Sequence, residues 1–390
     1  MNGEKHPDTL KKVSSAADLS EEQRREDEKY MHRCIQLARQ GQAGARPNPM
    51  VGAVIVHQGR IIGEGYHICQ GGPHAEVNAI ASVRQPDLLP QSTIYVSLEP
   101  CAHYGKTPPC ADLIVSRHIR RCVVGCRDPF AKVNGMGIQK LLDGGVEVTV
   151  GILEQECRDL NPNFMTFHTL HRPFITLKWA QSLDGMMGIV NDNDDDDDTL
   201  RYDDETPQPS TINHKPILLS TPLTMTLMHR RRALCDAILV GGGTALSDNP
   251  SLTVRRWTPR GQTGNLPLSQ HEAGKEWTQD NPLRVVIDAK GNLPDTLNIF
   301  NKEAETLIWP NWDLASLMQE LRSRNIQNLL VEGGAETLRR FLEAGLWDEL
   351  RVETAPIQIG AHGIKAPSLD GLKLQAHYLV GSNEIAIYVK

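Results

Sequence analysis

The chain has 390 residues, of which 39% are apolar and 23% are charged, and its formal net charge is −7. That length suits two hydrophobic cores better than one, and an acidic chain without a basic stripe argues against nucleic acid as a partner. No apolar run approaches the roughly 20 residues that span a bilayer, so no membrane partner is expected.

Targeting signals and cysteine usage predict a cytoplasmic protein. The first residues, Met1–Lys5, lack the apolar core of a secretory signal. Eight cysteines in so long a chain are not the pattern of a disulfide framework. Two of them suit a metal site, and we expect the other six to be free thiols in a reducing compartment.

The first half of the chain alternates predicted helices and strands. Residues 1–27 are polar and rich in charge, which favours a disordered tail or a loose helix. Residues 30–39 have the apolar spacing of one helix face, and further helices are expected to begin at His74 and at Cys110. Strands are expected in the apolar runs 51–56, 94–98, 121–126 and 146–151. This alternation predicts an α/β sandwich around a central sheet over residues 28–172.

A histidine and two cysteines in this half have the order of a hydrolytic zinc site. One imidazole (His74) and two thiolates (Cys101 and Cys110) suit tetrahedral zinc whose fourth position is left to water. Zinc lowers the pKa of that water to about 7, which supplies a nucleophile at neutral pH. Glu76 is too close to His74 to be a ligand, but it is placed to move protons. The alternative is two buried structural cysteines and a histidine that caps a helix.

The second half begins near Pro173, where a new pattern starts. Residues 174–180 read as a buried strand, and residues 237–240 form another that ends in three glycines. A strand through Val331 is likewise followed by glycines, and such turns let backbone amides approach a phosphate. Neither turn has the dinucleotide fingerprint of a Rossmann domain, and each could be an ordinary tight turn. Residues 173–390 are expected to form the second domain.

Three motifs in the first half resemble the pyrimidine deaminase of riboflavin biosynthesis. They are RPNPMVGA at 46–53, PHAEV at 73–77 and LEPCAHYGKTPPC at 98–110. The resemblance implies a cytidine-deaminase-like three-layer sandwich that acts on 2,5-diamino-6-ribosylamino-pyrimidinone 5′-phosphate. In that family a second domain, similar to dihydrofolate reductase, usually then reduces the ribosyl group to a ribityl chain with NADPH.

The resemblance also implies roles for single residues of the first half. Zn²⁺ would be held by His74, Cys101 and Cys110, with Glu76 as the proton shuttle. Asn48 would line the pyrimidine pocket, and His103, with Lys106 and Thr107, would contact the substrate. For His103 the alternatives are an imidazole turned to solvent or a spare metal ligand.

The second half resembles the reductase of the same pathway in FITLKWAQSLDG at 174–185, RALCDAILVGGGT at 232–244, DNPSLTVR at 248–255 and LVEGGA at 330–335. The NADPH contacts that this implies are Ala180, Thr244, Asp248 and Gly334. The substrate contacts that it implies are Arg232, Leu252, Arg255 and Glu332. Two arginines suit a phosphate, because a guanidinium binds phosphate through paired hydrogen bonds. Arg232 could instead be a surface charge, with Arg230 or Arg231 pointing inward, and Glu332 could be a structural carboxylate that caps the turn.

One stretch departs from the family pattern. Residues 215–222 lack a serine and a tryptophan that typical members carry there, which puts the nicotinamide or ribose contacts in question. An insertion of about residues 190–214 precedes it and contains the run Asp194–Asp198. Five adjacent like charges favour an extended, solvated loop over a cation site.

The sequence therefore favours a bifunctional, zinc- and NADPH-dependent enzyme of riboflavin biosynthesis whose partner is a small pyrimidine ribosyl phosphate. The alternative is a deaminase with an inactive or weakened reductase domain. A non-catalytic, zinc-stabilised binding protein is a third hypothesis, against which Glu76 argues, because a structural site has no use for that carboxylate. A nucleic-acid deaminase is disfavoured by the acidic balance. A homo-oligomer is expected.

Overall fold

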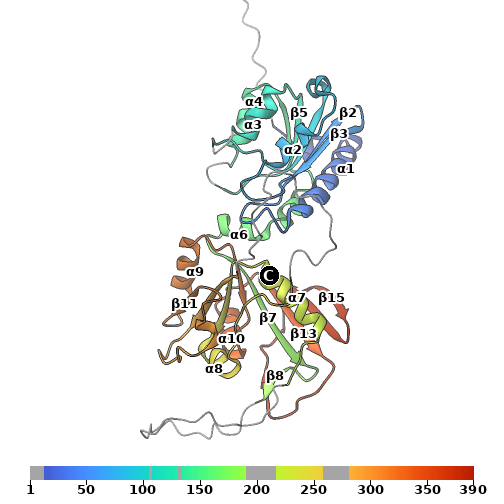
Figure 1. Cartoon of the computed structure of the whole chain (residues 1–390). Helices are drawn as coiled ribbons and strands as arrows, with labels where there is room; N and C mark the ends of the chain where they lie inside the picture. The colour runs from blue at the N-terminus through green and yellow to red at the C-terminus, as the bar shows by residue number, and fades with distance from the viewer. Residues whose placement is uncertain (1–12, 105–107, 131–133, 190–216, 258–280) are drawn as a thin grey trace, which may run out of the picture. The chain divides into compact units, whose positions relative to one another are not determined.

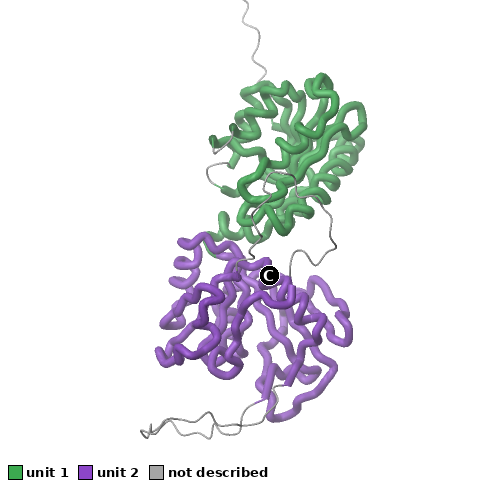
Figure 2. Tube along the Cα trace, in the orientation of Figure 1, with its two compact units in different colours: residues 1–172 green, residues 173–390 purple. Residues whose placement is uncertain are grey.

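The chain divides into two compact units, residues 1–172 and residues 173–390 (Figure 2). The computed structural model describes residues 13–104, 108–130, 134–189, 217–257 and 281–390. Outside these ranges lie the predicted acidic insertion with Asp194–Asp198, and also Lys106, Thr107, Lys215 and Pro216. None of the helices in the described ranges is long and apolar enough to cross a membrane.

Unit 1 is built on a six-stranded sheet (Figure 1). Its strands are, in spatial order, β1 (Ser14–Ser15), β6 (Glu147–Val150), β5 (Arg121–Cys126), β4 (Thr93–Leu98), β2 (Gly52–His57) and β3 (Arg60–Tyr66). The ladders β1–β6, β6–β5 and β5–β4 are parallel, and β2 runs antiparallel to both of its neighbours. The predicted strands at 121–126 and 94–98 are confirmed to within one residue.

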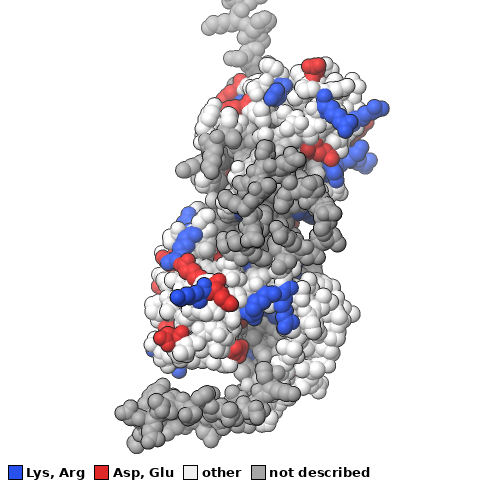
Figure 3. Space-filling model, in the orientation of Figure 1, with Lys and Arg blue, Asp and Glu red and all other residues white. Residues whose placement is uncertain are grey.

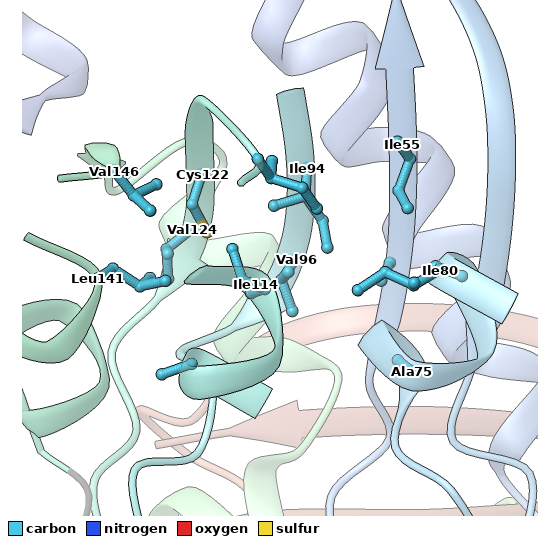
Figure 4. Close-up of a cluster of buried hydrophobic side chains, with 14 of the residues drawn as sticks. Ile55, Ala75, Ile80, Ile94, Val96, Ile114, Cys122, Val124, Leu141 and Val146 are labelled. Atoms are coloured by element: carbon cyan, nitrogen blue, oxygen red, sulfur yellow. The ribbon is translucent and has the colours of Figure 1, made fainter. Parts of the chain in front are cut away.

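Helices cover both faces of this sheet, because side chains along its strands alternate between two cores. The helices are α1 (Glu21–Ala38), α2 (Ala75–Ala81), α3 (Cys110–Ser116), α4 (Met136–Asp143), α5 (Glu154–Asp159) and α6 (Pro162–Thr169), with short 3₁₀ turns at η1 (Ala16–Asp18), η2 (Arg39–Gly41) and η3 (Pro86–Gln91). On β2, Ile55 packs with α2, α3 and α4, whereas Val54 packs with α1 and α5. Figure 4 shows the first of these cores, where Ile80 and Ile114 point toward Ile55 and Ile94. The predicted three-layer sandwich is confirmed.

Of the two alternatives for residues 1–27, a disordered tail or a loose helix, the described residues 21–27 form a helix. Helix α1 begins at Glu21, because the Ser20 hydroxyl caps the helix by accepting from the backbone N–H of Gln23. The first turn is acidic, which suits the positive end of the helix dipole. The Asp27 carboxylate is fully buried and pairs with Arg121 on β5. The described end of this segment is therefore part of unit 1.

Unit 2 contains an eight-stranded sheet (Figure 1). In spatial order its strands are β11 (Thr306–Trp309), β10 (Leu283–Ile287), β9 (Ala237–Gly241), β12 (Asn328–Val331), β7 (Phe174–Ser182), β13 (Glu349–Ala355), β16 (Asn383–Val389) and β15 (Lys373–Val380). The ladders from β11 to β13 are parallel, and β13, β16 and β15 are antiparallel. A separate pair joins β8 (Met186–Ile189) to β14 (Gly363–Lys365).

The parallel part of this sheet is also covered on both faces. The helices are α7 (Pro222–Ala233), α8 (Gly242–Asp248), α9 (Leu314–Ser323) and α10 (Ala335–Glu343), with a 3₁₀ turn at η5 (Asn298–Phe300). Helices α9 and α10 share one core with Leu239, and α8 packs into a second core with Val240. Consecutive residues of β9 thus face opposite cores, as a central strand requires.

Charged side chains of both signs are visible on each unit. On the face drawn in Figure 3, small groups of lysine and arginine and small groups of aspartate and glutamate stand among uncharged residues.

Candidate functional site

Three predicted metal ligands converge in unit 1. The ligand atoms of His74, Cys101 and Cys110 all lie within 4.8 Å of one another. His74 Nδ1 is 3.6 Å from Cys101 Sγ and 3.4 Å from Cys110 Sγ. Zinc bonds of about 2.0 Å to nitrogen and about 2.3 Å to sulfur give a tetrahedral N···S edge of about 3.5 Å. The donor set and its spacing therefore fit zinc.

Two helix starts bring these ligands together. His74 is the N-cap residue of α2, and Cys110 is the first residue of α3. The backbone N–H of Cys110 donates to Cys101 Sγ over 3.2 Å. Hydrogen bonds from the Cys110 thiol and from His74 lower the pKa of Cys101 to about 4. Thiolate is the form of cysteine that binds metal ions, so the site is prepared for a cation.

The predicted proton shuttle lies in the first turn of α2. The side chain of Glu76 is buried and hydrogen bonds with Cys110. Burial raises the pKa of Glu76 to about 7, although the neighbouring charge of His74 opposes this shift. A carboxyl with a pKa near neutrality both accepts and donates a proton under physiological conditions, as a shuttle must.

A second histidine, which the sequence motifs did not single out, joins Asn48 to this cluster. His67 is buried, and its ring lies edge-on to that of His74, with centroids 5.5 Å apart. Its Nδ1 lies 3.0 Å from the carbonyl of Pro73, so Nδ1 carries the hydrogen and Nε2 is an acceptor. Asn48 Nδ2 donates to that Nε2 over 3.2 Å. Asn48 is thus linked to the metal ligand His74 through His67, and its contact with the pyrimidine stays a prediction.

A buried carboxylate fixes the turn that carries Cys101. Glu99 accepts hydrogen bonds from the backbone amides of Asp128, Gly135, Gly137 and Ile138, over 3.0 to 3.3 Å. The last three of these amides lie at the start of α4, where a carboxylate is favoured. A Cβ on Gly137 would lie 1.9 Å from the Pro100 carbonyl oxygen, so the helix packs directly on the turn. A glutamate directly after an apolar strand is the available sequence signal.

His103 is exposed, and it lies in a loop whose next part, residues 105–107, is outside the described ranges. The described residues form no hydrogen bond with its imidazole. Its predicted contact with the substrate stays a prediction.

The second cluster lies at the carboxyl ends of parallel strands in unit 2. Strands β9 and β12 are neighbours, with Leu239 opposite Val331, so their glycine turns lie side by side. Ligands of α/β sheets bind at this edge. The backbone N–H of Gly334 donates to Thr244 Oγ1 over 2.8 Å, and a Cβ on Gly334 would lie 2.9 Å from that oxygen. Two predicted NADPH contacts are therefore in direct contact with each other.

The predicted substrate residues form a charged cluster beside these turns. Arg232 pairs with both oxygens of Glu332, over 2.9 and 2.6 Å, and its third nitrogen is 3.4 Å from the carbonyl oxygen of Thr253. Burial would raise the pKa of Glu332, but the charge and hydrogen bonds of Arg232 hold it below its usual value. Arg255 donates to Thr253 Oγ1 over 2.9 Å. Arg232 is thus the inward member of its run, and the neighbouring Arg231 pairs with Glu349 instead.

The remaining predicted contacts lie in different settings. Leu252 is buried and adopts a left-handed backbone conformation (φ 52°), which is strained for leucine and typical of functional loops. Ala180 is half-buried on β7, opposite Glu353 of β13. Asp248 ends α8 with its side chain exposed, where it accepts from the Ser247 hydroxyl.

Comparison with known proteins decides the family. Residues 24–126 match the cytidine and deoxycytidylate deaminase zinc-binding region, and residues 173–385 match the RibD C-terminal domain. The riboflavin biosynthesis protein RibD of Aquifex aeolicus is 33% identical over 368 residues, which cover 87% of this chain and 91% of that protein. The chain belongs to the RibD family. The predicted family and both predicted folds are confirmed.

Other RibD proteins match over a similar extent. That of Bacillus amyloliquefaciens is 35% identical over 88% of this chain and 87% of its own length. A solved Acinetobacter baumannii RibD is 28% identical, with a TM-score of 0.75 over 94% of this chain and 99% of that one. A deaminase/reductase of diaminohydroxyphosphoribosylaminopyrimidine and 5-amino-6-(5-phosphoribosylamino)uracil from Thermotoga maritima is 31% identical, with a TM-score of 0.73 over the same shares. Both halves of the chain are matched, which gives no support to an inactive reductase.

Proposed function

We propose that unit 1 of this RibD protein deaminates 2,5-diamino-6-ribosylamino-pyrimidinone 5′-phosphate. Unit 2 then reduces the product with NADPH. The observation that carries the proposal is the convergence of His74, Cys101 and Cys110 beside the buried Glu76, in a chain whose second half belongs to the RibD reductase domain. The Thermotoga maritima relative is named for the same two activities.

In the deaminase site, His74, Cys101 and Cys110 would hold zinc, which lowers the pKa of a coordinated water to about 7. Glu76 takes a proton from the attacking water and gives it to the ring nitrogen. It then takes the proton of the hydroxyl group that has formed on the ring carbon and gives it to the amino group, which leaves as ammonia while the carbonyl forms. Its pKa of about 7 suits each of these transfers. Asn48, held by His67, orients the pyrimidine ring.

In the reductase site, NADPH when bound supplies the hydride, so no side chain of the protein needs to carry it. We assign Ala180, Thr244, Asp248 and the Gly334 turn to the cofactor side. The backbone amides of the glycine turns lie at a helix start, which favours a phosphate group.

The substrate side of this site is assigned to Arg232, Leu252, Arg255 and Glu332. Arg232 is committed to Glu332, which fixes its orientation. Arg255 has an exposed side chain and, among the described residues, no carboxylate partner. Guanidinium groups of this kind suit the 5′-phosphate of the substrate.

The test is a mass-spectrometric time course of the purified protein with the diaminopyrimidine ribosyl phosphate and NADPH. We expect the deaminated species first and the ribityl product second. Accumulation of the deaminated species alone would favour the alternative of a weakened reductase. Glu76→Gln should abolish deamination while the zinc content stays at that of the unchanged protein, and deamination by this variant would contradict the shuttle role.

We also propose that the protein forms a homo-oligomer through unit 2. Strand β15 ends the eight-stranded sheet and exposes Leu374, Tyr378 and Leu379. An exposed apolar strand at a sheet edge is a surface that a second copy of a chain commonly covers. Light scattering should give a mass above 43.3 kDa, and Leu379→Lys should shift that mass toward the monomer.

A further inference from the structure

His229 lies one helical turn before Arg232 on α7, and no motif of the sequence singled it out. Its side chain is buried, with 6% of its surface exposed. The ring nitrogen Nδ1 accepts a hydrogen bond from the backbone N–H of Arg255 over 3.0 Å. The imidazole therefore contacts the main chain of Arg255, one of the two predicted phosphate ligands. It lies on the same helix as Arg232, the other predicted ligand.

The protonation state of this imidazole follows from the bond that it accepts. An Nδ1 that accepts from an amide carries no hydrogen, so the ring is neutral and Nε2 is the protonated nitrogen. Burial, followed by the charges of Arg232 and Arg255, lowers the pKa of His229 to about 4. At physiological pH, Nδ1 of His229 is therefore unprotonated and can accept the hydrogen bond from the backbone N–H of Arg255.

His229 is one of several groups that hold this segment. Arg232 donates to the carbonyl oxygen of Thr253 over 3.4 Å, and the guanidinium of Arg255 donates to the hydroxyl of the same Thr253. The backbone N–H of Val254 donates to Asn281 Oδ1 over 2.9 Å, and Leu252 has a left-handed backbone that costs about 1 kcal/mol or more without outside support. Among these contacts, the hydrogen bond to His229 is the one that engages the backbone N–H of Arg255 itself and links it to the helix of Arg232.

We propose that His229 is a positioning residue of the reductase site, which holds Arg255 beside Arg232 so that the two guanidinium groups address one phosphate monoester. The proposal rests on the proposed function of unit 2. The charges support it: Glu332 offsets the charge of Arg232, and Arg255 has no carboxylate partner among the described residues, so one positive charge remains for an anion.

Two substitutions of similar size separate this role from a structural one. In His229→Asn, the amide oxygen stands near the place of Nδ1 and can still accept from Arg255. In His229→Gln, the amide stands near the place of Nε2, and the acceptor at Nδ1 is lost. We expect His229→Gln to raise the reductase KM for the 5′-phosphorylated substrate about fivefold to tenfold, as the loss of one hydrogen bond implies. His229→Asn should keep KM within about twofold of the unchanged protein.

Three further measurements serve as controls for the KM of the phosphorylated substrate. The KM for the substrate without its phosphate should be the same in both variants, and so should the affinity for NADPH measured by fluorescence titration. The deaminase rate of the same preparation reports the amount of intact protein. Equal KM values in the two variants would overturn the proposal, and so would a loss of NADPH affinity in His229→Gln, because it marks a purely structural role.

The substitution Arg255→Ala tests the assignment of Arg255 to the substrate phosphate separately from the positioning role of His229. If Arg255→Ala raises the KM for the phosphorylated substrate and His229→Gln does not, the positioning role is wrong and the phosphate site stands. If Arg255→Ala leaves that KM unchanged, the assignment of Arg255 to the substrate phosphate is itself wrong, and the role of His229 is overturned with it.

Discussion

Replacing Asp27 by asparagine should destabilise unit 1 far more than breaking a similar ion pair on the same helix. The Asp27 carboxylate receives both terminal nitrogens of Arg121, over 2.8 and 2.7 Å, the Tyr95 hydroxyl over 2.9 Å and the Gln23 amide over 3.1 Å. The side chains of Asp27 and Arg121 are only 0% and 12% exposed. Asparagine removes the buried counter-charge of the guanidinium and leaves only the half-exposed Glu147, 3.8 Å away, so we expect a cost of about 3 kcal/mol, the lower end for a broken buried pair.

The matched control is Glu64→Gln, which breaks the pair of Arg33 on α1 with Glu64 on β3. That pair also has two short hydrogen bonds, of 2.7 and 3.0 Å, but its side chains are 38% and 32% exposed. Water stabilises the charge that remains, so we expect a loss of about 1 kcal/mol or less.

The assay uses the zinc-loaded, full-length protein in increasing denaturant. All six tryptophans lie after residue 172, so tryptophan fluorescence follows unit 2 and deaminase activity follows unit 1. Asp27→Asn should move the activity transition to lower denaturant and leave the fluorescence transition in place. Equal shifts of the activity transition in Asp27→Asn and Glu64→Gln would refute the reasoning, because burial would then have no bearing on the pair.

Three further outcomes are expected. Removal of zinc by a chelator should abolish deamination and leave NADPH-dependent reduction of the deaminated substrate intact, whereas a parallel loss of both would contradict independent sites. Glu332→Gln strands Arg232 in a buried position, so the fluorescence transition should lose about 3 kcal/mol, with deamination retained as the control. Burial raises the pKa of Asp128 from 3.8 to about 6. Its protonated form therefore favours the folded state below pH 4, and this contribution is lost as the pH rises through 6. Relative to Asp128→Asn, the unfolding free energy of unit 1 should fall by up to about 3 kcal/mol between pH 4 and pH 6 and then stay level.

The features that the sequence predicts well depend on residues that are close together in the chain. The ligands His74 and Cys110 stand at helix starts that proline and glycine mark, and the strands are apolar runs whose limits follow from composition. The apolar spacing predicts a helix only from residue 30, whereas α1 begins at Glu21, because its first half, EEQRREDEK, has no apolar stripe. The pairing of Asp27 with Arg121, 94 residues further along, stabilises that half, and no local pattern shows it.

The same reason explains which site residues the sequence missed. Glu99 reaches amides that lie 29 to 39 residues away, and His229 reaches an amide 26 residues away. His67 is recognisable only once the fold brings its ring beside that of His74. Each of these side chains acts on the backbone or on a ligand residue, so its role depends on tertiary contacts that spacing does not encode.

Residues 217–222, the described part of the 215–222 departure from the family pattern, are tied to the sheet just before and at the start of α7. The Ser220 hydroxyl donates to the buried Glu353, and Asn383 bridges Glu353 and the carbonyl of Leu219. The helix is then tied to the sheet near its other end by the pairs Arg231–Glu349 and Arg232–Glu332. Helix α7 is therefore anchored at both ends, which holds Arg232 and His229 against the sheet without the serine and tryptophan of typical members. A consequence of the altered segment should therefore be sought in the affinity for NADPH before it is sought in recognition of the substrate phosphate.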